Sequence, residues 1–405
     1  MTESPTTDAP ASAPVRRVWP VLAVLTAATF WTVTAEMLPS GLLPSMSRDL
    51  GVSEGTTGVL VSAWAVTIAI VGIPLVRLTL RVPRTVLLTV SLAVTAPANL
   101  VTALASDFTV ALAGRILAAT AHGLFWALVV SYVATVVSPQ RLGRALSLVL
   151  AGPTLAGLAG LPAAVLVAEY IGWRWVFVGL SLILALTAVA VGLILPHSRR
   201  PETPAGTEPA GAWDRSARGV VFIAVGGGLV LVGHFTAFTY ITALVTDLSG
   251  LGEGAIPAIL LVLGVTGGAG VLVSGVAADR FPRASLVSAS ALVAAGLALL
   301  LLGDDRSAVF VAGAFVWGFA IGAFPPILQT RVLRLSSRSF RPLAGSIIVT
   351  VLNLGVAAGA TLGGLILPHG KPALVLAALL AASTGTVALA LSRRGDSHRS
   401  ATRPK

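Results

Sequence analysis

The sequence predicts an all-α membrane protein with twelve transmembrane helices arranged as two six-helix pseudo-repeats. Three observations lead to this fold class. Of 405 residues, 56% are hydrophobic and only 11% are charged, and the mean hydropathy is +0.92. A soluble globule of this size needs more charge to cover its surface. The apolar residues also fall into runs of about 20, the length that crosses a bilayer. Basic residues are concentrated in every second loop between these runs, so that most of them lie on one side of the membrane.

The first half begins with a Pro-, Ala-, Thr- and Ser-rich segment, residues 1–17, which we expect to be a disordered cytoplasmic tail. The apolar run that follows is longer than the 7–15 residues of a cleavable signal core. It therefore indicates an uncleaved first span. The N-terminal bundle, residues 18–195, contains six apolar runs at 19–44, 56–79, 85–105, 108–136, 143–168 and 173–195.

The second half follows a Pro-rich, charged segment without periodicity. This composition over residues 196–217 predicts a flexible cytoplasmic linker. The C-terminal bundle, residues 218–392, is followed by a cytoplasmic tail, residues 393–405. Its six apolar runs lie at 219–246, 255–278, 284–303, 307–333, 342–367 and 372–392.

The basic residues predict the orientation of these spans. With both termini in the cytoplasm, 22 of the 27 Lys and Arg residues fall on the cytoplasmic side. Only Arg48, Arg174, Arg306 and Lys371 fall on the other side, and Arg115 lies inside a span. A miscounted span would destroy this alternation, so the bias supports both the count and a multi-pass topology in the cell membrane.

Composition also excludes several classes of function. The chain has no cysteine, which removes disulfides, thiolate metal sites and Cys nucleophiles. No GxxxxGK[ST] run is present for ATP, and no cluster of metal ligands or catalytic groups is visible, so we expect no cofactor, no metal and no enzyme activity. The net charge of +11 follows the topology and does not indicate nucleic acid. The expected partners are the lipid bilayer, a small-molecule substrate and protons, and a monomer suffices for this architecture.

The two halves resemble each other weakly. Small residues recur every four positions in the fifth and eleventh spans, which allows close approach of helix backbones in lipid. Parallel six-helix repeats are a known transporter architecture. The residues that match in the fourth and tenth spans, each pair separated by 199 positions, are Gly114 and Gly313, Gly123 and Gly322, and Phe125 and Phe324.

Charged residues inside the spans are the first functional candidates, because such residues are rare and costly in hydrocarbon. Glu36 is the acidic residue that lies well within a span, and Arg115 lies at a matching depth in the fourth. The arginine favours the ionised carboxylate and burial favours the neutral form, a balance that proton coupling can use. Structural alternatives stay open for both: a carboxylate that reaches the outer surface, and an ion pair that locks the two spans.

His122 completes the candidate proton-coupling set, since it shares a helical face with Arg115 and an imidazole can exchange a proton near neutral pH. A neutral, hydrogen-bonded histidine is the structural alternative. Polar and aromatic residues elsewhere in the spans are candidates for a substrate cavity, although buried tryptophans more often serve packing. These cavity candidates are Trp31, Thr32, Trp126, His234, Phe238, Trp317 and Asn353.

Four segments resemble motifs of the major facilitator superfamily, specifically its twelve-helix drug:proton antiporters near the sugar-efflux and arabinose-efflux permeases. Residues 36–65, EMLPSGLLPSMSRDLGVSEGTTGVLVSAWA, are similar to the opening signature of the family. Residues 114–128, GRILAATAHGLFWAL, resemble the family's fourth-span motif. The antiport motif of the fifth span resembles AGPTLAGLAGLP at 151–162, and the loop motif resembles GVAADRFPR at 275–283. The resemblance implies the major facilitator fold, with a central cavity lined by spans 1, 4, 7 and 10.

The resemblance also implies roles for motif residues. It makes Asp279, with Arg280 and Arg283, a conformational latch at the cytoplasmic side. The equivalent loop of the first half departs from the motif, because Leu80 stands where an acid is usual. The antiport motif is loose, with separated glycines in place of an adjacent pair; its residues here are Gly152, Pro153, Gly157 and Gly160.

The function that these features predict is secondary active transport by alternating access. We expect proton-coupled efflux of a small amphipathic compound such as an antibiotic or a sugar-like metabolite. Uptake of a nucleoside or sugar is the alternative within transport. A membrane-embedded enzyme or a sensor ranks below both, because the sequence shows neither clustered catalytic groups nor a soluble output domain.

Overall fold

The computed structural model describes residues 18–79, 82–138, 141–196, 215–303, 306–337 and 340–392. The two expected tails and residues 197–214 of the expected linker lie outside the described residues. Within the described part, twelve helices are long and apolar enough to cross a membrane. The prediction of twelve apolar spans is therefore confirmed.

The N-terminal bundle carries the first six spans. Its fifth span consists of two α-helices joined by a π-helical turn, η3. The helices are α1 (Val18–Gly41), α2 (Leu43–Leu50), α3 (Glu54–Leu78), α4 (Arg84–Ala103), α5 (Phe108–Val136), α6 (Leu142–Leu155), η3 (Ala156–Gly160), α7 (Leu161–Ile171) and α8 (Trp173–Ile194).

The C-terminal bundle carries the other six spans. Its first helix begins at Arg215, inside the segment 196–217 that the sequence assigned to the linker. The helices are α9 (Arg215–Phe238), α10 (Ile241–Leu248), η4 (Glu253–Ala255), α11 (Ile256–Arg280), α12 (Pro282–Leu302), α13 (Ser307–Leu335), α14 (Arg341–Ile366), η5 (Leu367–His369) and α15 (Lys371–Leu391).

The first and seventh spans each break into a long and a short helix, although the sequence predicted continuous runs at 19–44 and 219–246. In the first span the break at Leu42 lies between Pro39 and Pro44, whose rings lack the N–H that would continue the helical hydrogen bonds. In the seventh span a break at the same place separates α9 from α10. The two short helices, α2 and α10, contact each other across the bundles.

Side-chain caps define where two of the long helices begin. Ser53 accepts a hydrogen bond from the Thr56 N–H and starts α3. Asp107 accepts hydrogen bonds from the N–H groups of Thr109 and Val110 and starts α5. These are the donors that an α-helix leaves free at its first turn. The bond from the Val110 N–H is the main cause of a pKa of Asp107 below the ordinary value.

The same packing scheme recurs in both bundles. In the N-terminal bundle, α4 packs on α5 and α8, α3 packs on α5, and α1 packs on α6 and α8. The corresponding helices of the C-terminal bundle make the corresponding contacts: α12 with α13 and α15, α11 with α13, and α9 with α14 and α15. The fourth and tenth spans, α5 and α13, are each 29 residues long. The weak internal similarity of the sequence therefore reflects two copies of one helix arrangement.

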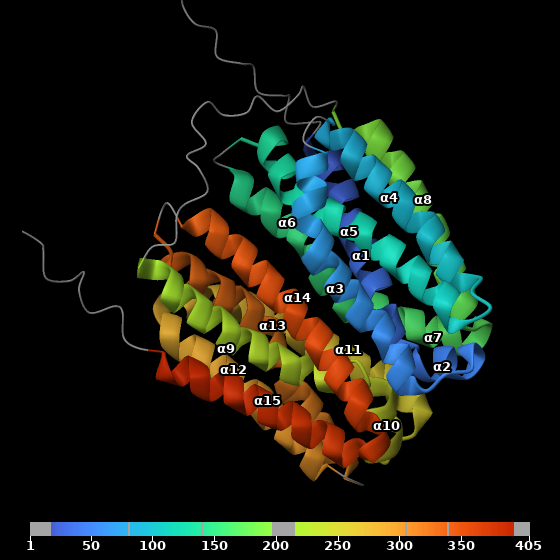
Figure 1. Cartoon of the computed structure of the whole chain (residues 1–405), viewed down its shortest axis with the longest axis vertical. Coiled ribbons are helices and arrows are strands. Elements are labelled where there is room, and N and C mark those ends of the chain that lie inside the picture. The colour runs from blue at the N-terminus through green and yellow to red at the C-terminus, as the bar shows by residue number, and fades with distance from the viewer. Residues whose placement is uncertain are drawn as a thin grey trace, which may run out of the picture.

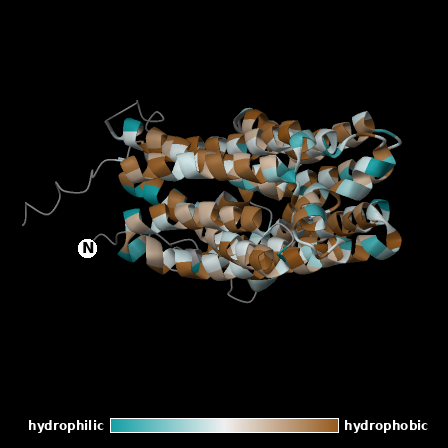
Figure 2. Ribbon diagram, turned by 90° about the horizontal axis from the view of Figure 1, so that it is seen from below, coloured by the Kyte–Doolittle hydropathy of each residue, from teal (hydrophilic) through white to brown (hydrophobic). Residues whose placement is uncertain are grey.

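Exposed apolar side chains cover the outside of the bundles. Leu193 and Leu272 are 82% and 83% exposed although both lie on long helices. In Figure 2 the ribbons are brown along much of their length, and the strongest teal gathers near their ends. This pattern fits a protein that is surrounded by hydrocarbon.

The two bundles meet mainly through α3 with α14 and through η3 and α7 with α11. We call the end of the protein where α1 begins and α15 ends the basic end, since most arginines gather there. Figure 1 shows the bundles converging at the end that carries α2 and α10, and spreading toward the basic end. At the converging end, the Ser62 and Thr361 hydroxyls lie 3.0 Å apart in a hydrogen bond.

Glycines allow the backbones of the two bundles to touch. A Cβ atom at Gly55 would lie 2.6 Å from the carbonyl oxygen of Gly364, and one at Gly264 would lie 2.5 Å from the Cα of Leu158. The Gly157 carbonyl oxygen lies nearer still to that position. Backbone atoms cannot move aside as a side chain can, so these positions accept no larger residue in this conformation.

We predict that Gly264→Ala opens the contact between the bundles at the converging end. The chain contains no cysteine, so a single Ser62→Cys reporter measures this opening by its labelling with a membrane-impermeant maleimide. Labelling is expected to rise, because Ser62 is only 6% exposed here. The control is Gly275→Ala on the same helix, where an added Cβ meets nothing within 4 Å. Equal labelling of both variants would refute the prediction.

Candidate functional site

Arg115 is fully buried and binds the main chain of α1. Its Nη1 donates to the Ala35 carbonyl oxygen at 2.8 Å, and its Nη2 donates to the Glu36 carbonyl oxygen at 2.9 Å. The Ala35 carbonyl would ordinarily accept the N–H of residue 39, but Pro39 has none. Arg115 therefore donates a hydrogen bond to a carbonyl that a proline leaves without its helical donor. In hydrocarbon, every buried backbone carbonyl needs such a partner within the protein.

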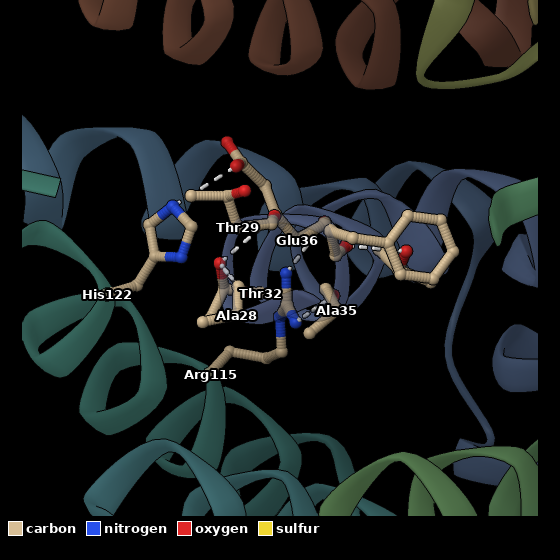
Figure 3. A network of polar contacts seen from close by, with 9 residues as sticks. Ala28, Thr29, Thr32, Ala35, Glu36, Arg115 and His122 are labelled. Carbon is tan, nitrogen blue, oxygen red and sulfur yellow. Dashed lines mark hydrogen bonds and ion pairs between the residues drawn. The ribbon is translucent and has the colours of Figure 1, made fainter. Parts of the chain in front are cut away.

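The Glu36 carboxylate contacts His122 and not Arg115. Its Oε2 lies 3.3 Å from the His122 Nε2. Figure 3 shows the carboxylate pointing toward the imidazole, while the Arg115 guanidinium lies by the α1 backbone. The side chain of Glu36 is 32% exposed and that of His122 is 2% exposed. Of the alternatives that the sequence left open, a direct ion pair between Glu36 and Arg115 is not formed, because the guanidinium bonds to the main chain of α1.

Trp64 on α3 is a member of this group that sequence reasoning did not select. The Arg115 Cζ lies 4.0 Å from the centroid of its ring, and the His122 ring lies 5.1 Å away, tilted by 58°. The indole is 1% exposed, and its Nε1 has no hydrogen-bond partner among the described residues. An aromatic residue on the second span near the depth of Arg115 was the only signal in the sequence.

The threonines near Glu36 connect α1 to itself and to α6. Thr32, a cavity candidate, donates to the Ala28 carbonyl at 2.8 Å and so bonds within its own helix. Thr29 donates to the Val149 carbonyl on α6 at 2.8 Å. That carbonyl is left free by Pro153, four residues later. Thr29 therefore repeats the interaction of Arg115: a side chain from a neighbouring helix donates a hydrogen bond to a carbonyl that a proline leaves without its helical donor.

The antiport-motif residues lie between α1 and the other bundle. Gly152 packs against Thr29, and Gly160 packs against Thr34 and the ring of Phe30. Gly157 and Gly160 belong to the π-helical turn η3, a rare geometry that often marks functional sites. On its other side η3 contacts α11 of the C-terminal bundle.

The cavity candidates of the C-terminal bundle form one aromatic cluster, with Asn353 apart from it. His234 stacks on Phe238 at 5.2 Å and meets Trp317 edge-on at 5.3 Å. Phe235 completes this cluster at 4.6 Å from the imidazole. The His234 Nδ1 and Trp317 Nε1 have no hydrogen-bond partner among the described residues. Asn353 donates to the Val349 carbonyl of its own helix, at 3.0 Å.

The remaining two cavity candidates lie in the N-terminal bundle and are half-buried. Trp126 lies 6.2 Å from the His122 ring, and Trp31 packs edge-on against Phe30 at 4.5 Å. Trp126 therefore belongs to the group around Glu36, whereas the contact recorded for Trp31 is with its chain neighbour.

Asp279, the acid of the expected latch at the basic end, contacts an arginine of another helix. Asp279 forms an ion pair with Arg334 on α13, which also donates to the Ala278 carbonyl at 3.0 Å. Arg280 lies over the Phe281 ring at 5.7 Å, and Arg283 donates to the Ala390 carbonyl at 2.6 Å. The ion pair of Asp279 thus joins α11 to α13, and the action of Asp279, Arg280 and Arg283 as a latch stays a prediction.

The first half lacks both members of this ion pair. The positions 199 residues before Asp279 and Arg334 are occupied by Leu80 and Thr135, so the acid and its basic partner are replaced together. Leu80 itself lies outside the described residues. Within the described part of the chain, no group of three or more His, Asp or Glu side chains could hold a metal ion.

Comparison with known families identifies the fold. A family model described as Major Facilitator Superfamily matches residues 25–303 and, in a second match, residues 250–405. The chain belongs to the Major Facilitator Superfamily. The resemblance drawn from the motifs is thereby confirmed, and this protein is a membrane transporter and not an enzyme.

Relatives of this superfamily member include named efflux proteins. Two chloramphenicol efflux pumps of Mycobacterium tuberculosis, from strains CDC 1551 / Oshkosh and ATCC 25618 / H37Rv, are each 34% identical to it over 383 residues. The alignments cover 93% of this chain and 91% of each pump. A chloramphenicol resistance protein of Streptomyces lividans is 34% identical over 340 residues, 83% of this chain and 86% of that protein. These relatives place this superfamily member among the efflux transporters.

Solved structures agree on the fold. A transporter of the POT family in complex with 5-aminolevulinic acid matches with a TM-score of 0.76 at 12% identity, over 92% of this chain and 96% of that chain. A bacterial homologue of the lysosomal transporter Spinster, in an inward-facing and occupied conformation, matches with a TM-score of 0.70 at 16% identity. That match covers 94% of this chain and 97% of the other. At such low identities the likeness concerns the helix arrangement alone.

We predict that Arg115→Met destabilises the protein less when Pro39 is also replaced. The single variant leaves the Ala35 carbonyl buried and unbonded, which costs about 1–3 kcal/mol. In Pro39→Ala the new N–H at position 39 takes over that carbonyl. A double-mutant cycle on thermal unfolding in detergent checks this coupling.

The matched control for this cycle is Pro153→Ala. The carbonyl that Pro153 frees is filled by Thr29, so the loss caused by Arg115→Met is expected to be unchanged in this background. If Pro39→Ala and Pro153→Ala alter that loss equally, the assigned partnership between Arg115 and the proline-freed carbonyl is wrong.

Proposed function

We propose that this protein is a proton-coupled antiporter that exports an amphipathic aromatic compound, with chloramphenicol as the first compound to test. The observation that carries the proposal is the contact between the Glu36 carboxylate and the His122 imidazole inside the spans. A carboxylate and an imidazole at this distance can share one proton. The pair lies inside the membrane spans, where ionisable side chains are costly and are usually kept for a function.

The coupling follows from the different surroundings of the two groups. Glu36 is partly exposed, which lets it exchange a proton with water, whereas His122 is buried. Protonation removes the charge of the carboxylate and so lowers the cost of enclosing it in hydrocarbon. Arg115 holds the backbone beside Glu36, so a change at the carboxylate acts on α1 directly. Binding of substrate and binding of the proton then compete for the same region.

The substrate region is proposed from the aromatic residues around this pair and in the other bundle. Trp126 borders His122, and the cluster of His234, Phe238 and Trp317 combines aromatic rings with two ring nitrogens that have no hydrogen-bond partner among the described residues. Flat apolar surfaces with few polar groups suit an aromatic compound that carries hydroxyl or amide groups. The names of the chloramphenicol pumps among the relatives favour this substrate class.

We place the basic end on the cytoplasmic side of a cell membrane, because most Lys and Arg residues lie at that end. The bundles converge at the opposite end and spread toward the basic end (Figure 1), as an inward-facing transporter does. The Asp279–Arg334 pair joins α11 to α13 at the cytoplasmic side. One chain supplies both bundles, so a monomer is the proposed working unit.

We predict that Glu36→Gln abolishes the response of chloramphenicol transport to a pH gradient. The amide cannot carry the proton, so uptake into inverted vesicles no longer becomes uphill, while movement down a concentration gradient continues. The control is Glu169→Gln, an exposed carboxylate at the end of α7. Uphill transport with a normal gradient response in Glu36→Gln would show that the coupling assignment is wrong.

We predict that Asp279→Asn slows transport roughly two- to five-fold, since an exposed ion pair contributes at most about 1 kcal/mol. The exchange Asp279→Arg with Arg334→Asp restores the pair and is expected to recover part of the rate. Initial rates in vesicles provide the measurement. Arg280→Gln serves as a control, because Arg280 contacts Phe281 and not the carboxylate. Equal slowing by both substitutions would contradict the latch built on Arg334.

A further inference from the structure

The indole of Trp64 contacts both Arg115 and His122. It accepts the Arg115 guanidinium over its ring at 4.0 Å and lies 5.1 Å from the His122 ring. Arg115 and His122 stand seven residues apart on α5, so they share one helix face two turns apart, and both contact Trp64 of α3. Trp64 itself is buried in a small cluster with Ala98, Ala118 and Ala119. Packing alone would be served by any large apolar residue here.

A protonated His122 would add a second positive charge beside Arg115 in a medium of low dielectric constant. Like charges in such a medium disfavour each other strongly. Two groups in contact with the imidazole can offset that cost: the Glu36 carboxylate at 3.3 Å and the electron-rich ring of Trp64. The ring also stabilises the guanidinium, and it fills with apolar volume a space that water would otherwise enter.

The other charged residues on the helices around α5 lie too far from His122 to offset its charge. The elements that pack against α5 are α1, α3, α4 and α6. On α1 the charged residue within the helix is Glu36 itself. On the other three elements the charged residues lie in the first or last turns of the helices: Glu54, Arg77, Arg84 and Arg144.

We propose that Trp64 is a positioning residue that sets the proton affinity of the Glu36–His122 pair and holds Arg115 on α1. This proposal rests on the proton-coupled function above and names a determinant of its pH dependence. Removing the ring leaves the protonated imidazole less stabilised, so the pair binds its proton only at higher proton concentration. The pH dependence of transport then moves toward acid.

The test compares the pH at which chloramphenicol transport into inverted vesicles is half-maximal. Trp64→Leu is expected to shift this pH by about one unit toward acid, since a desolvated cation–π contact contributes roughly what one pH unit represents. Trp64→Phe keeps a ring with a weaker face and is expected to shift it less. A lower rate with an unchanged pH profile, or a shift toward alkaline pH, would overturn the proposal.

Trp173→Phe is the matched control. Trp173 is also buried and also carries an arginine over its ring, with the Arg174 Cζ at 4.4 Å, but its Nε1 bonds to Asp49 and its ring partner is Phe177. Loss of this indole is expected to lower stability and leave the pH profile in place. A shift equal to that of Trp64→Phe would assign the effect to general destabilisation and refute the proposal.

Two further measurements separate the possible failures. Glu36→Gln in the same assay tests the coupling itself: if it abolishes the gradient response while Trp64→Leu leaves the profile unchanged, the Trp64 proposal alone fails. Intrinsic fluorescence in a background that carries both Trp126→Phe and Trp317→Phe, which removes the other indoles near His122 and His234, needs neither transport nor substrate. Protonated imidazole quenches a neighbouring indole, so we expect an acid quench that both Trp64→Phe and His122→Gln remove; a quench that survives Trp64→Phe would overturn the assignment.

Discussion

A backbone carbonyl inside hydrocarbon has no water to bond, and this constraint accounts for the centre of the N-terminal bundle. Pro39 and Pro153 each remove an N–H from a spanning helix and leave a carbonyl four residues earlier without its donor. Arg115 donates a hydrogen bond to the first of these carbonyls, that of Ala35, and Thr29 donates one to the second, that of Val149. The two bonds tie α5 to α1 and α1 to α6. The two prolines therefore create the acceptors that hold α1 against α5 and α6.

The same constraint separates the roles of the charged groups. Because the main chain occupies the Arg115 guanidinium, the Glu36 carboxylate is left to the imidazole of His122 and to the space between the spans. A direct ion pair with the arginine would hold the carboxylate ionised. In the proposed coupling, the carboxylate and the imidazole take up and release one proton together. Arg115 then acts by fixing the backbone of α1 next to that carboxylate.

The two bundles share a helix arrangement but divide these tasks. Position 314, the equivalent of Arg115 in the second half, is an alanine, and the C-terminal bundle carries an aromatic cluster around His234 instead. Conversely, the Asp279–Arg334 pair has no charged counterpart in the first half. Between the bundles, glycines let backbones touch, and side chains add contacts such as the hydrogen bond between Ser62 and Thr361.

The sequence by itself determined the twelve spans and the shared depth of Glu36 and Arg115, because hydropathy and helix rise depend on one helix at a time; the sidedness of the spans stays a prediction from charge placement. Tertiary structure alone decided that Arg115 bonds to the backbone, that Glu36 meets His122, and that Arg334 pairs with Asp279. Helical periodicity gives the face of a residue on its own helix. It gives neither the rotation of the neighbouring helix nor which acceptor a long side chain reaches, and so Trp64 became visible only when α3 was packed against α5.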